Sequence, residues 1–423
     1  MQSRALNPED EKSKTLTTSA AAYVDALFAQ ALQQRASDLH LEPQKTGLQI
    51  RLRVDGLLHD LPSPSADIAQ RLCTRIKILA KQDIAERRLP QDGRISVICR
   101  GQQLDLRVSS LPTLWGEKLV LRIVLQESSI LPLSDLGLNE NQFHDLSNAL
   151  AQPQGLILVT GPTGSGKTLT LYSALQTLNQ RHINISTAEE PVEIPLPGIN
   201  QVGIKTQIGL DFSNSLRALL RQDPDVLMVG EIRDPDTASM AIRAAQTGHL
   251  VLSTVHTKSA SATLGRMRQL GISDRDLEES VTLVIAQRLL RRLCDQCKIP
   301  DRKPGSIAST SGAKVFHPNF RGCAACLRGY RGRLGIFELC SPISCARNSP
   351  TQTDECGRSP KVAHSDQGDA HWQSAFAPSP NQNLRAIGLS RYFDGQTSLE
   401  EIERVLPQAS FGPNVLTAEE FVS

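Results

Sequence analysis

The sequence predicts an α/β protein: a parallel-sheet domain that carries a four-cysteine knuckle and follows a smaller α+β domain. Three observations support this prediction. From residue 154 onward, short apolar segments alternate with helical ones, which is typical of a parallel sheet covered by helices. A glycine-rich phosphate loop follows the first of these apolar segments. Alternating strands and two amphipathic helices fill residues 20–127.

The N-terminal part contains a polar segment, residues 1–19, that we expect to be flexible. Apolar side chains then recur at helical spacing over Tyr23–Gln34 and Ile68–Leu79, which predicts two helices. Alternating apolar and polar residues predict strands, and two dipeptides predict turns between them. The strands are expected near residues 48–54, 104–108 and 119–125, and the turns at Asp55-Gly56 and Asp92-Gly93.

Residues 128–153 are predicted to form a linker with one helix. The parallel-sheet domain is expected over residues 154–339. Ligands of such sheets bind at the carboxyl ends of the strands. The strands are predicted at Leu156–Thr160, Asn184–Thr187, Val226–Val229 and Leu250–Val255.

The phosphate loop fits the pattern G-x-x-x-x-G-K-[ST] at every fixed position. Its residues are Gly161, Pro162, Thr163, Gly164, Ser165, Gly166, Lys167 and Thr168. An apolar strand precedes it and a helix follows it, so backbone N–H groups and a helix N-terminus are available to a phosphate. Lys167 is expected to reach the β- and γ-phosphates of ATP, and Thr168 to hold Mg²⁺. The alternative is a glycine-rich turn without a ligand.

A second acidic element is predicted where the strand Val226–Val229 ends, at Gly230-Glu231. Glu231 is the candidate general base for the attacking water. An Asp usually stands where this chain has Gly230, so Mg²⁺ would depend on Thr168, phosphate oxygens, water and the Glu189–Glu190 pair. A solvated acidic pair in a loop is the alternative.

Two histidines flank the last of the predicted parallel strands. His249 precedes the stretch LVLSTV and His256 follows it. Each could sense or stabilise a γ-phosphate, although a hydrogen-bonded structural histidine is the common alternative.

Composition excludes several classes of protein. The chain has 423 residues and a formal net charge of +2, which argues against a dedicated nucleic-acid binder. It has no apolar run long enough to span a bilayer and no signal-peptide core at its start. A soluble cytoplasmic protein is therefore expected, in which nine cysteines would not form disulfides.

Four of the cysteines form two C-x-x-C pairs. Cys294 and Cys297 make one pair, and Cys323 and Cys326 make the other. Four thiolates at this spacing suit a tetrahedral structural Zn²⁺, so a zinc element is predicted over residues 291–328. A redox dithiol and a nucleic-acid zinc ribbon are the alternatives.

Together these stretches resemble the secretion ATPases of type II secretion and type IV pilus assembly. The resemblance runs from about Ala36 to Leu339. It rests on ASDLHLEP, RLRVDGLLHDL, QDGR, DLRVSSLPTLWGEKLVLRI, the phosphate loop, AEEPVE, LRALLRQDPDVLMVGEIRDPDTA, AAQTGHLVLSTVHT and the paired cysteines.

The resemblance implies a RecA-like ATPase domain preceded by a PAS-like domain, and a homo-hexamer that binds ATP between the two. It gives roles to individual residues. Glu231 matches the glutamate of the second nucleotide motif, and Glu190 stands where the family's acidic box has aspartate. His249 and His256 match a histidine box, while Arg94 and Arg107 match arginines that approach the γ-phosphate. Arg217 and Arg233 are weaker candidates of the same kind.

The family also implies a partner and a place in the cell. Its members work on the cytoplasmic side of the inner membrane and associate with that membrane through a platform protein. The family implies no specific nucleic-acid partner. The zinc knuckle, which pilus retraction ATPases usually lack, favours export or assembly. The alternatives are a DNA-uptake or DNA-transport motor of related fold and an assembly factor that binds ATP but hydrolyses it poorly.

Two features depart from the family pattern. Few residues precede ASDLHLEP, where secretion members carry a larger module that docks to the platform. Residues 340–384 are rich in Ser, Pro and Gly and are predicted to be disordered, or to result from compensating frameshifts. Residues 385–423 are expected to be a helical remnant that, in the frameshift case, fails to dock.

Overall fold

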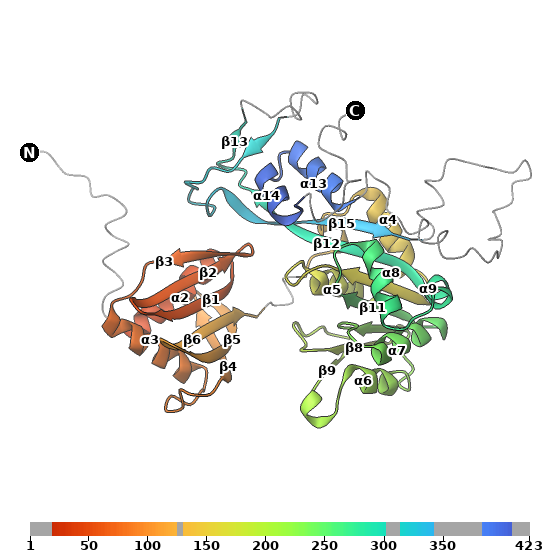
Figure 1. The fold of residues 1–423 in the computed structure, drawn as a ribbon, viewed down its shortest axis with the longest axis horizontal. Helices are drawn as coiled ribbons and strands as arrows, with labels where there is room; N and C mark the ends of the chain where they lie inside the picture. The colour runs from red at the N-terminus through yellow and green to blue at the C-terminus, as the bar shows by residue number, and fades with distance from the viewer. Residues whose placement is uncertain (1–18, 125–129, 302–313, 342–382, 408–423) are drawn as a thin grey trace, which may run out of the picture. The chain divides into compact units, whose positions relative to one another are not determined.

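The computed structural model describes residues 19–124, 130–301, 314–341 and 383–407. The predicted flexible residues 1–19 and the irregular segment 340–384 therefore lie almost wholly outside the described residues. The chain divides into two compact units, residues 1–125 and 126–423 (Figure 1). Each unit is built around its own β-sheet.

The first unit is a six-stranded antiparallel sheet in the order β3-β2-β1-β6-β5-β4. Its strands are β1 (Ala36–Gln44), β2 (Gly47–Val54), β3 (Leu57–Leu61), β4 (Gln91–Cys99), β5 (Gln102–Thr113) and β6 (Gly116–Ile123). Its helices are α2 (Ala20–Gln33) and α3 (Ala66–Leu79). Alternate residues of β2, such as Ile50 and Leu52, are buried. The predicted antiparallel α+β unit is thus what the structure shows.

The turn predicted at Asp92-Gly93 is wrong, because both residues lie inside β4. A Cβ atom added to Gly93 would lie 2.3 Å from the carbonyl oxygen of Ala80. The glycine is therefore needed for the close approach of the strand to the end of α3, rather than for a turn.

The second unit contains a seven-stranded sheet in the order β15-β12-β7-β11-β10-β8-β9. All neighbouring pairs are parallel except β12 and β15. Its strands are β7 (Gly155–Thr160), β8 (Ile185–Glu189), β9 (Asn200–Gly203), β10 (Val226–Val229), β11 (Leu250–Val255), β12 (Val281–Leu293) and β15 (Tyr330–Cys340). This confirms the predicted parallel strands.

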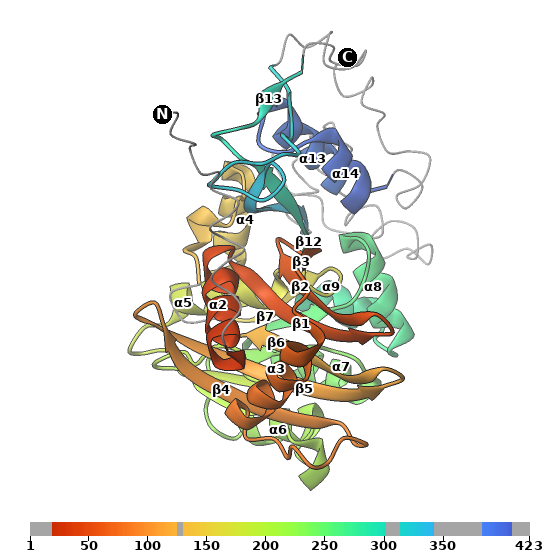
Figure 2. The same ribbon diagram turned by 90° about the vertical axis from the view of Figure 1, so that its left-hand side faces the viewer.

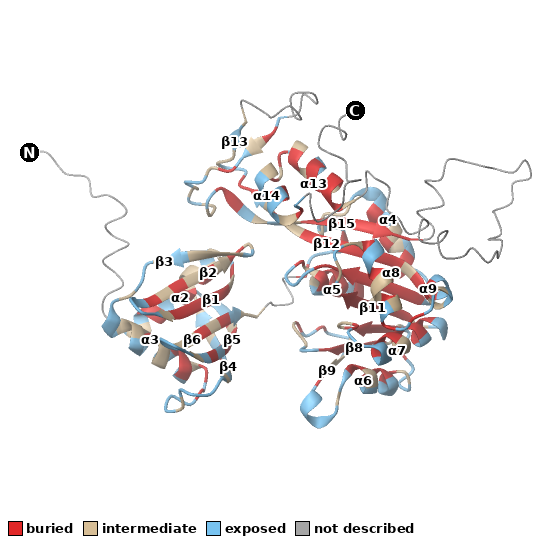
Figure 3. Cartoon of the chain, in the orientation of Figure 1, coloured by how far each residue is buried: buried red, intermediate tan, exposed pale blue. Residues whose placement is uncertain are grey.

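Helices cover both faces of this sheet, as its residue pattern requires. Successive residues of β7 alternate between two hydrophobic clusters: Leu156 and Leu158 lie in one, and Ile157 and Val159 in the other. The central strands β7, β8, β10 and β11 are buried throughout (Figure 3). The helices and short elements are η2 (Leu133–Asp135), α4 (Glu140–Leu150), α5 (Lys167–Leu178), η3 (Thr206–Ile208), α6 (Phe212–Leu219), α7 (Pro235–Gln246), α8 (Ala260–Gln269), α9 (Asp274–Ser280), β13 (Ile299–Pro300) and β14 (Phe316–His317).

The C-terminal helices α13 (Leu384–Phe393) and α14 (Leu399–Val405) pack on the second unit. Both views show them beside the upper parts of β12 and β15 (Figures 1 and 2). Their Leu384, Leu389 and Ile402 are fully buried in the cluster that also covers β12. In the structure this helix pair docks on the second unit through its apolar face, whereas the frameshift hypothesis concerns residues outside the described ranges.

None of the helices in the described ranges combines the length and apolarity that a membrane span requires.

Candidate nucleotide site and cysteine cluster

The phosphate loop joins β7 to α5, at the carboxyl edge of the parallel sheet. Gly161 opens the loop with φ of 152°, and Gly166 precedes the helix with φ of 90°. A Cβ on Gly161 would lie 2.6 Å from the carbonyl oxygen of Gln287, and one on Gly166 would lie 2.9 Å from Gln287 Nε2. Both positions therefore require glycine, for the backbone angle and for the space.

Lys167 lies at the first position of α5 and is largely buried. Its ammonium group donates to the carbonyl oxygens of Gly161 at 2.8 Å and Pro162 at 3.2 Å. Burial lowers the pKa of Lys167 to about 8, while the charge of Glu231 raises it and that of Arg288 lowers it further. The buried hydroxyl of Ser165 makes no hydrogen bond with any residue that the structure describes. A buried cation, an unpaired hydroxyl and a glycine cradle together fit a bound phosphate. Thr168 is exposed beside them, where it could face a cation.

Glu231 lies two residues after β10, and His256 lies one residue after the neighbouring strand β11. Its carboxylate forms an ion pair with Arg233, and its Oε2 lies 3.4 Å from Nε2 of His256. Arg233 also lies 3.8 Å from Glu190, the residue at the acidic-box position. The structure thus brings four predicted residues together at the carboxyl ends of β8, β10 and β11.

The two neighbouring glutamates after β8 have different environments. Glu189 is buried and accepts hydrogen bonds from Tyr172, Thr187 and Gln201. Burial, and then the bond to Glu189, raise the pKa of Tyr172. Glu190 is much more exposed. Glu189 therefore fixes the loop, whereas Glu190 is available to a ligand.

The structure separates His249 from His256. His249 precedes β11, and its Nδ1 lies 3.0 Å from the carbonyl oxygen of Ala244. The six residues of β11 lie between the two histidines, which corresponds to roughly 20 Å at about 3.3 Å per residue. Within one copy of the chain, His249 is therefore at the opposite end of the strand from the phosphate loop.

The two predicted arginines of the first unit are direct neighbours. Arg94 on β4 pairs in register with Arg107 on β5. Arg94 is exposed, and Arg107 is partly exposed. In the second unit, Arg217 is exposed at the end of α6.

Two residues that line the phosphate loop were not predicted. Gln287 and Arg288 lie in the middle of β12, and both are almost fully buried. Gln287 Oε1 accepts a hydrogen bond of 2.8 Å from Thr170, in the first turn of α5. The guanidinium of Arg288 donates to the carbonyl oxygens of Gln287 and Lys258. A polar pair inside the long apolar run TLVIAQRLL is the signal that could have identified them.

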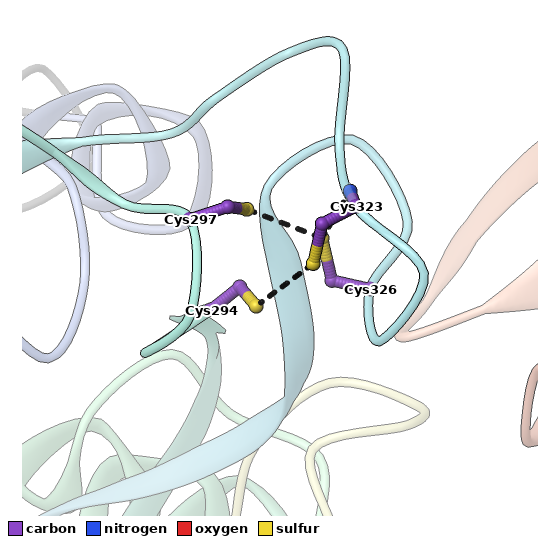
Figure 4. Close-up of side chains that lie close together, drawn as sticks. All are labelled: Cys294, Cys297, Cys323 and Cys326. Carbon is purple, nitrogen blue, oxygen red and sulfur yellow. Dashed lines mark hydrogen bonds between the residues drawn. The ribbon is translucent and has the colours of Figure 1, made fainter.

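The four cysteines of the two C-x-x-C pairs lie together, as Figure 4 shows. Their sulfur atoms all lie within 4.8 Å of one another. Three of the separations are 3.8 Å (Cys294 to Cys323), 3.5 Å (Cys297 to Cys326) and 3.6 Å (Cys323 to Cys326). Four sulfurs bound to one zinc at about 2.3 Å would lie about 3.8 Å apart. A backbone hydrogen bond from Ala325 lowers the pKa of Cys323 to about 7, which favours its thiolate. The cluster therefore has the size and chemistry of a tetrahedral metal site.

The sequence matches one family model, described as type II/IV secretion system protein, over residues 14–404. The chain is 46% identical over 393 residues to the type IV pilus assembly ATPase PilB of Acinetobacter baylyi, covering 90% of this chain and 66% of that protein. It is 52% identical over 310 residues to the HofB homolog of Escherichia coli, a protein transport protein, covering 73% and 67%. It is 42% identical to type II secretion system protein E of Pseudomonas aeruginosa, covering 90% and 74%. The chain thus spans about two thirds of the length of the first two relatives.

Two solved structures of motor or ATPase proteins are also similar to this chain. The pilus retraction motor PilT with bound ADP matches with a TM-score of 0.57 and 25% identity, over 93% of this chain and 98% of that one. The Legionella pneumophila ATPase DotB matches with a TM-score of 0.63, 92% of this chain and 95% of that one. At 18% identity, the DotB match shows a shared fold.

Proposed function

The chain belongs to the type II/IV secretion system protein family, and on that premise we propose that it is a Mg²⁺-dependent ATPase. The motor it forms would energise the assembly of a type II secretion pseudopilus or a type IV pilus. One observation carries the proposal. The phosphate loop with Lys167 and the carboxylate of Glu231 lie at the same edge of one parallel sheet, close enough for the charge of Glu231 to raise the pKa of Lys167.

Each residue would have a distinct task. The loop amides and Lys167 would hold the β- and γ-phosphates, and Thr168 and Glu190 would face the Mg²⁺ with its water shell. Bound Mg²⁺ would neutralise charge on the phosphate oxygens. Glu231 would accept the proton of the attacking water, and His256 would hold the Glu231 carboxylate in place.

Arg94 and Arg107 are proposed to act when a copy of the first unit closes on bound nucleotide. Their planar, permanently charged groups suit the charge that develops on a transferred phosphoryl group. Because these two arginines lie on a different unit from the phosphate loop, closure and ring assembly would both control turnover. We propose a homo-hexamer in which His249 acts at a contact between neighbouring copies.

We propose a membrane platform protein as the partner and the cytoplasmic side of the inner membrane as the location. Proteins named for type IV pilus assembly and type II secretion support a site of action on the cytoplasmic side of the inner membrane, reached through a membrane platform protein. The cysteine cluster would bind one Zn²⁺ that holds the knuckle together.

Hydrolysis assays test the enzymatic part of the proposal. Purified protein should release phosphate from ATP with Mg²⁺ and not with EDTA. Lys167→Ala should abolish this activity, whereas the exposed Lys205, changed to Ala, serves as the matched control. Equal activity of Lys167→Ala and wild type would contradict the proposal.

A further inference from the structure

Gln287 and Arg288 connect β12 to both ends of the nucleotide site. Through Thr170 and Gly166, Gln287 contacts the end of the phosphate loop. The guanidinium of Arg288 lies 3.2 Å from the position that a Cβ of Gly161 would occupy, at the start of the loop. Arg288 also binds the carbonyl oxygen of Lys258, two residues after His256. Arg288 therefore lies beside the first glycine of the loop and holds the segment that follows His256.

A buried carboxylate on the neighbouring strand lies near this arginine. Glu338 on β15 is the cross-strand neighbour of Ala286, and it is 2% exposed. Burial raises the pKa of Glu338, while two backbone N–H groups and the positive charge of Arg288 lower it. In turn, burial lowers the pKa of Arg288 and the charge of Glu338 raises it. Each group thus stabilises the ionised form of the other in a site that water does not reach.

The same carboxylate binds the first amides of two helices. Glu338 Oε1 accepts a hydrogen bond of 2.9 Å from Ala260 N, and Oε2 accepts one of 3.2 Å from Leu384 N. These amides begin α8 and α13, and helix N-termini favour a negative charge. Helix α8 follows the segment of His256, and α13 belongs to the C-terminal helix pair. Glu338 therefore joins that pair to the elements that surround the phosphate loop.

Further contacts make the docking of the helix pair specific. Arg385 donates to the carbonyl oxygen of Leu406 and so joins α13 to the end of α14, whereas Arg391 donates to the carbonyl oxygen of Gly137, before α4. Glu401, fully buried, pairs with Arg291, three residues beyond Arg288 on β12. The helix pair is thus held to the strand that supports the phosphate loop at Arg291, and to the segment before α4 at Gly137.

We propose that Glu338 and Arg288 are positioning residues that couple docking of the helix pair α13–α14 to the geometry of the phosphate loop. The proposal rests on the proposed function in so far as the loop binds nucleotide. Its consequence is reciprocal: displacing the pair weakens nucleotide binding, and bound nucleotide tightens the pair. A partner that displaced residues 383–407 from the second unit would thereby regulate the ATPase without contacting the nucleotide.

Hydrogen exchange on the full chain tests this coupling. In Glu338→Gln the side chain keeps its size but loses its charge. Its NH₂ group then faces one of the two backbone N–H groups and cannot accept a hydrogen bond from it. Without nucleotide, we expect faster exchange in two separate places, the start of α13 (383–387) and the phosphate loop (161–166). The matched control is Glu400→Gln, which removes an exposed carboxylate from α14 and leaves Glu338 in place. Faster exchange at 383–387 with wild-type exchange at 161–166 would overturn the proposal.

A second measurement uses wild-type protein and Mg²⁺-ADP, so it does not depend on a variant that folds. Saturating nucleotide should slow exchange at 383–387 as well as at the phosphate loop. The dissociation constant for ADP should rise about tenfold in Glu338→Gln and stay at the wild-type value in Glu400→Gln. Protection of the loop alone, with no change at 383–387, would also overturn the coupling. If ADP protects neither region, the proposed nucleotide site fails, while the nucleotide-free comparison still decides the coupling.

Discussion

The imidazole Nε2 of His256 lies 3.4 Å from Oε2 of Glu231, although the two residues follow different strands. The parallel pairing of β10 with β11 explains this contact, because it brings the two strand ends to one edge. The Glu231 carboxylate is also paired with Arg233, so a cation and an imidazole hold it from two sides. Such an arrangement restricts the directions in which the carboxylate can accept a proton.

Changing His256 to Asn should therefore slow hydrolysis more than it weakens binding. We expect kcat to fall roughly a hundredfold while the dissociation constant for ADP changes little, because the imidazole orients Glu231 rather than holding phosphate. Steady-state kinetics and ADP titration measure the two quantities. The exposed His144, changed to Asn, is the control. A loss of ADP affinity equal to the loss of kcat would show that His256 binds nucleotide instead.

Nucleotide affinity should depend on pH through Lys167. Its pKa is about 8, so the ammonium group is already present below pH 8 and must be formed by proton uptake above it. The dissociation constant for ADP should therefore be flat below pH 7.5 and rise roughly eightfold by pH 9. Titrations in a series of buffers check this slope. An affinity that improves as the pH rises through this range would contradict the assignment.

The cysteine cluster should contain about one zinc ion per chain. Cys294→Ser and Cys326→Ser should each reduce the metal content to about zero and expose residues 291–328 to proteases, because three thiolates no longer close the site. Metal analysis of protein purified without chelators measures the content. Cys99→Ser, on a strand of the other unit, is the control. Full zinc content in Cys294→Ser would exclude the tetrahedral site.

Removing the buried carboxylate of Glu401 should destabilise the second unit. Arg291 stacks 3.8 Å from the ring of Tyr330 and pairs with Glu401, so Glu401→Gln leaves a buried guanidinium without its anion. A loss of about 3–5 kcal/mol is expected. Denaturant unfolding measures it, with the exposed neighbour Glu400→Gln as the control. A loss under about 0.5 kcal/mol would mean that the ion pair does not support the fold.

Much of the site could be predicted from sequence, because it consists of local patterns. The phosphate loop needs glycines and a lysine at fixed spacing between a strand and a helix, and each of these can be recognised within about twenty residues. The cysteine pairs are recognisable for the same reason. Glu231 follows a short apolar strand. Residues that follow parallel strands lie at the carboxyl edge of the sheet, so the sequence alone indicates that Glu231 lies at that edge.

The unpredicted features depend on distant contacts. Gln287 and Arg288 belong to a strand whose pairing with β7 cannot be read from its own residues, so their contact with Gly161 was not foreseen. Asp92-Gly93 has the composition of a turn, yet Gly93 lies where a Cβ atom would clash with the carbonyl oxygen of Ala80. A helical C-terminal segment was predicted, but its docking on β12 and β15 was not, because a long segment without periodicity separates it from the domain.

The most direct test of the motor is ATP hydrolysis measured across a series of protein concentrations, with Glu231→Gln alongside. The account predicts that activity per chain rises steeply with concentration as rings form, requires Mg²⁺, and falls at least a hundredfold in the variant, which still binds ADP. Nucleotide binding without turnover at any concentration, with Glu231→Gln indistinguishable from wild type, would contradict it.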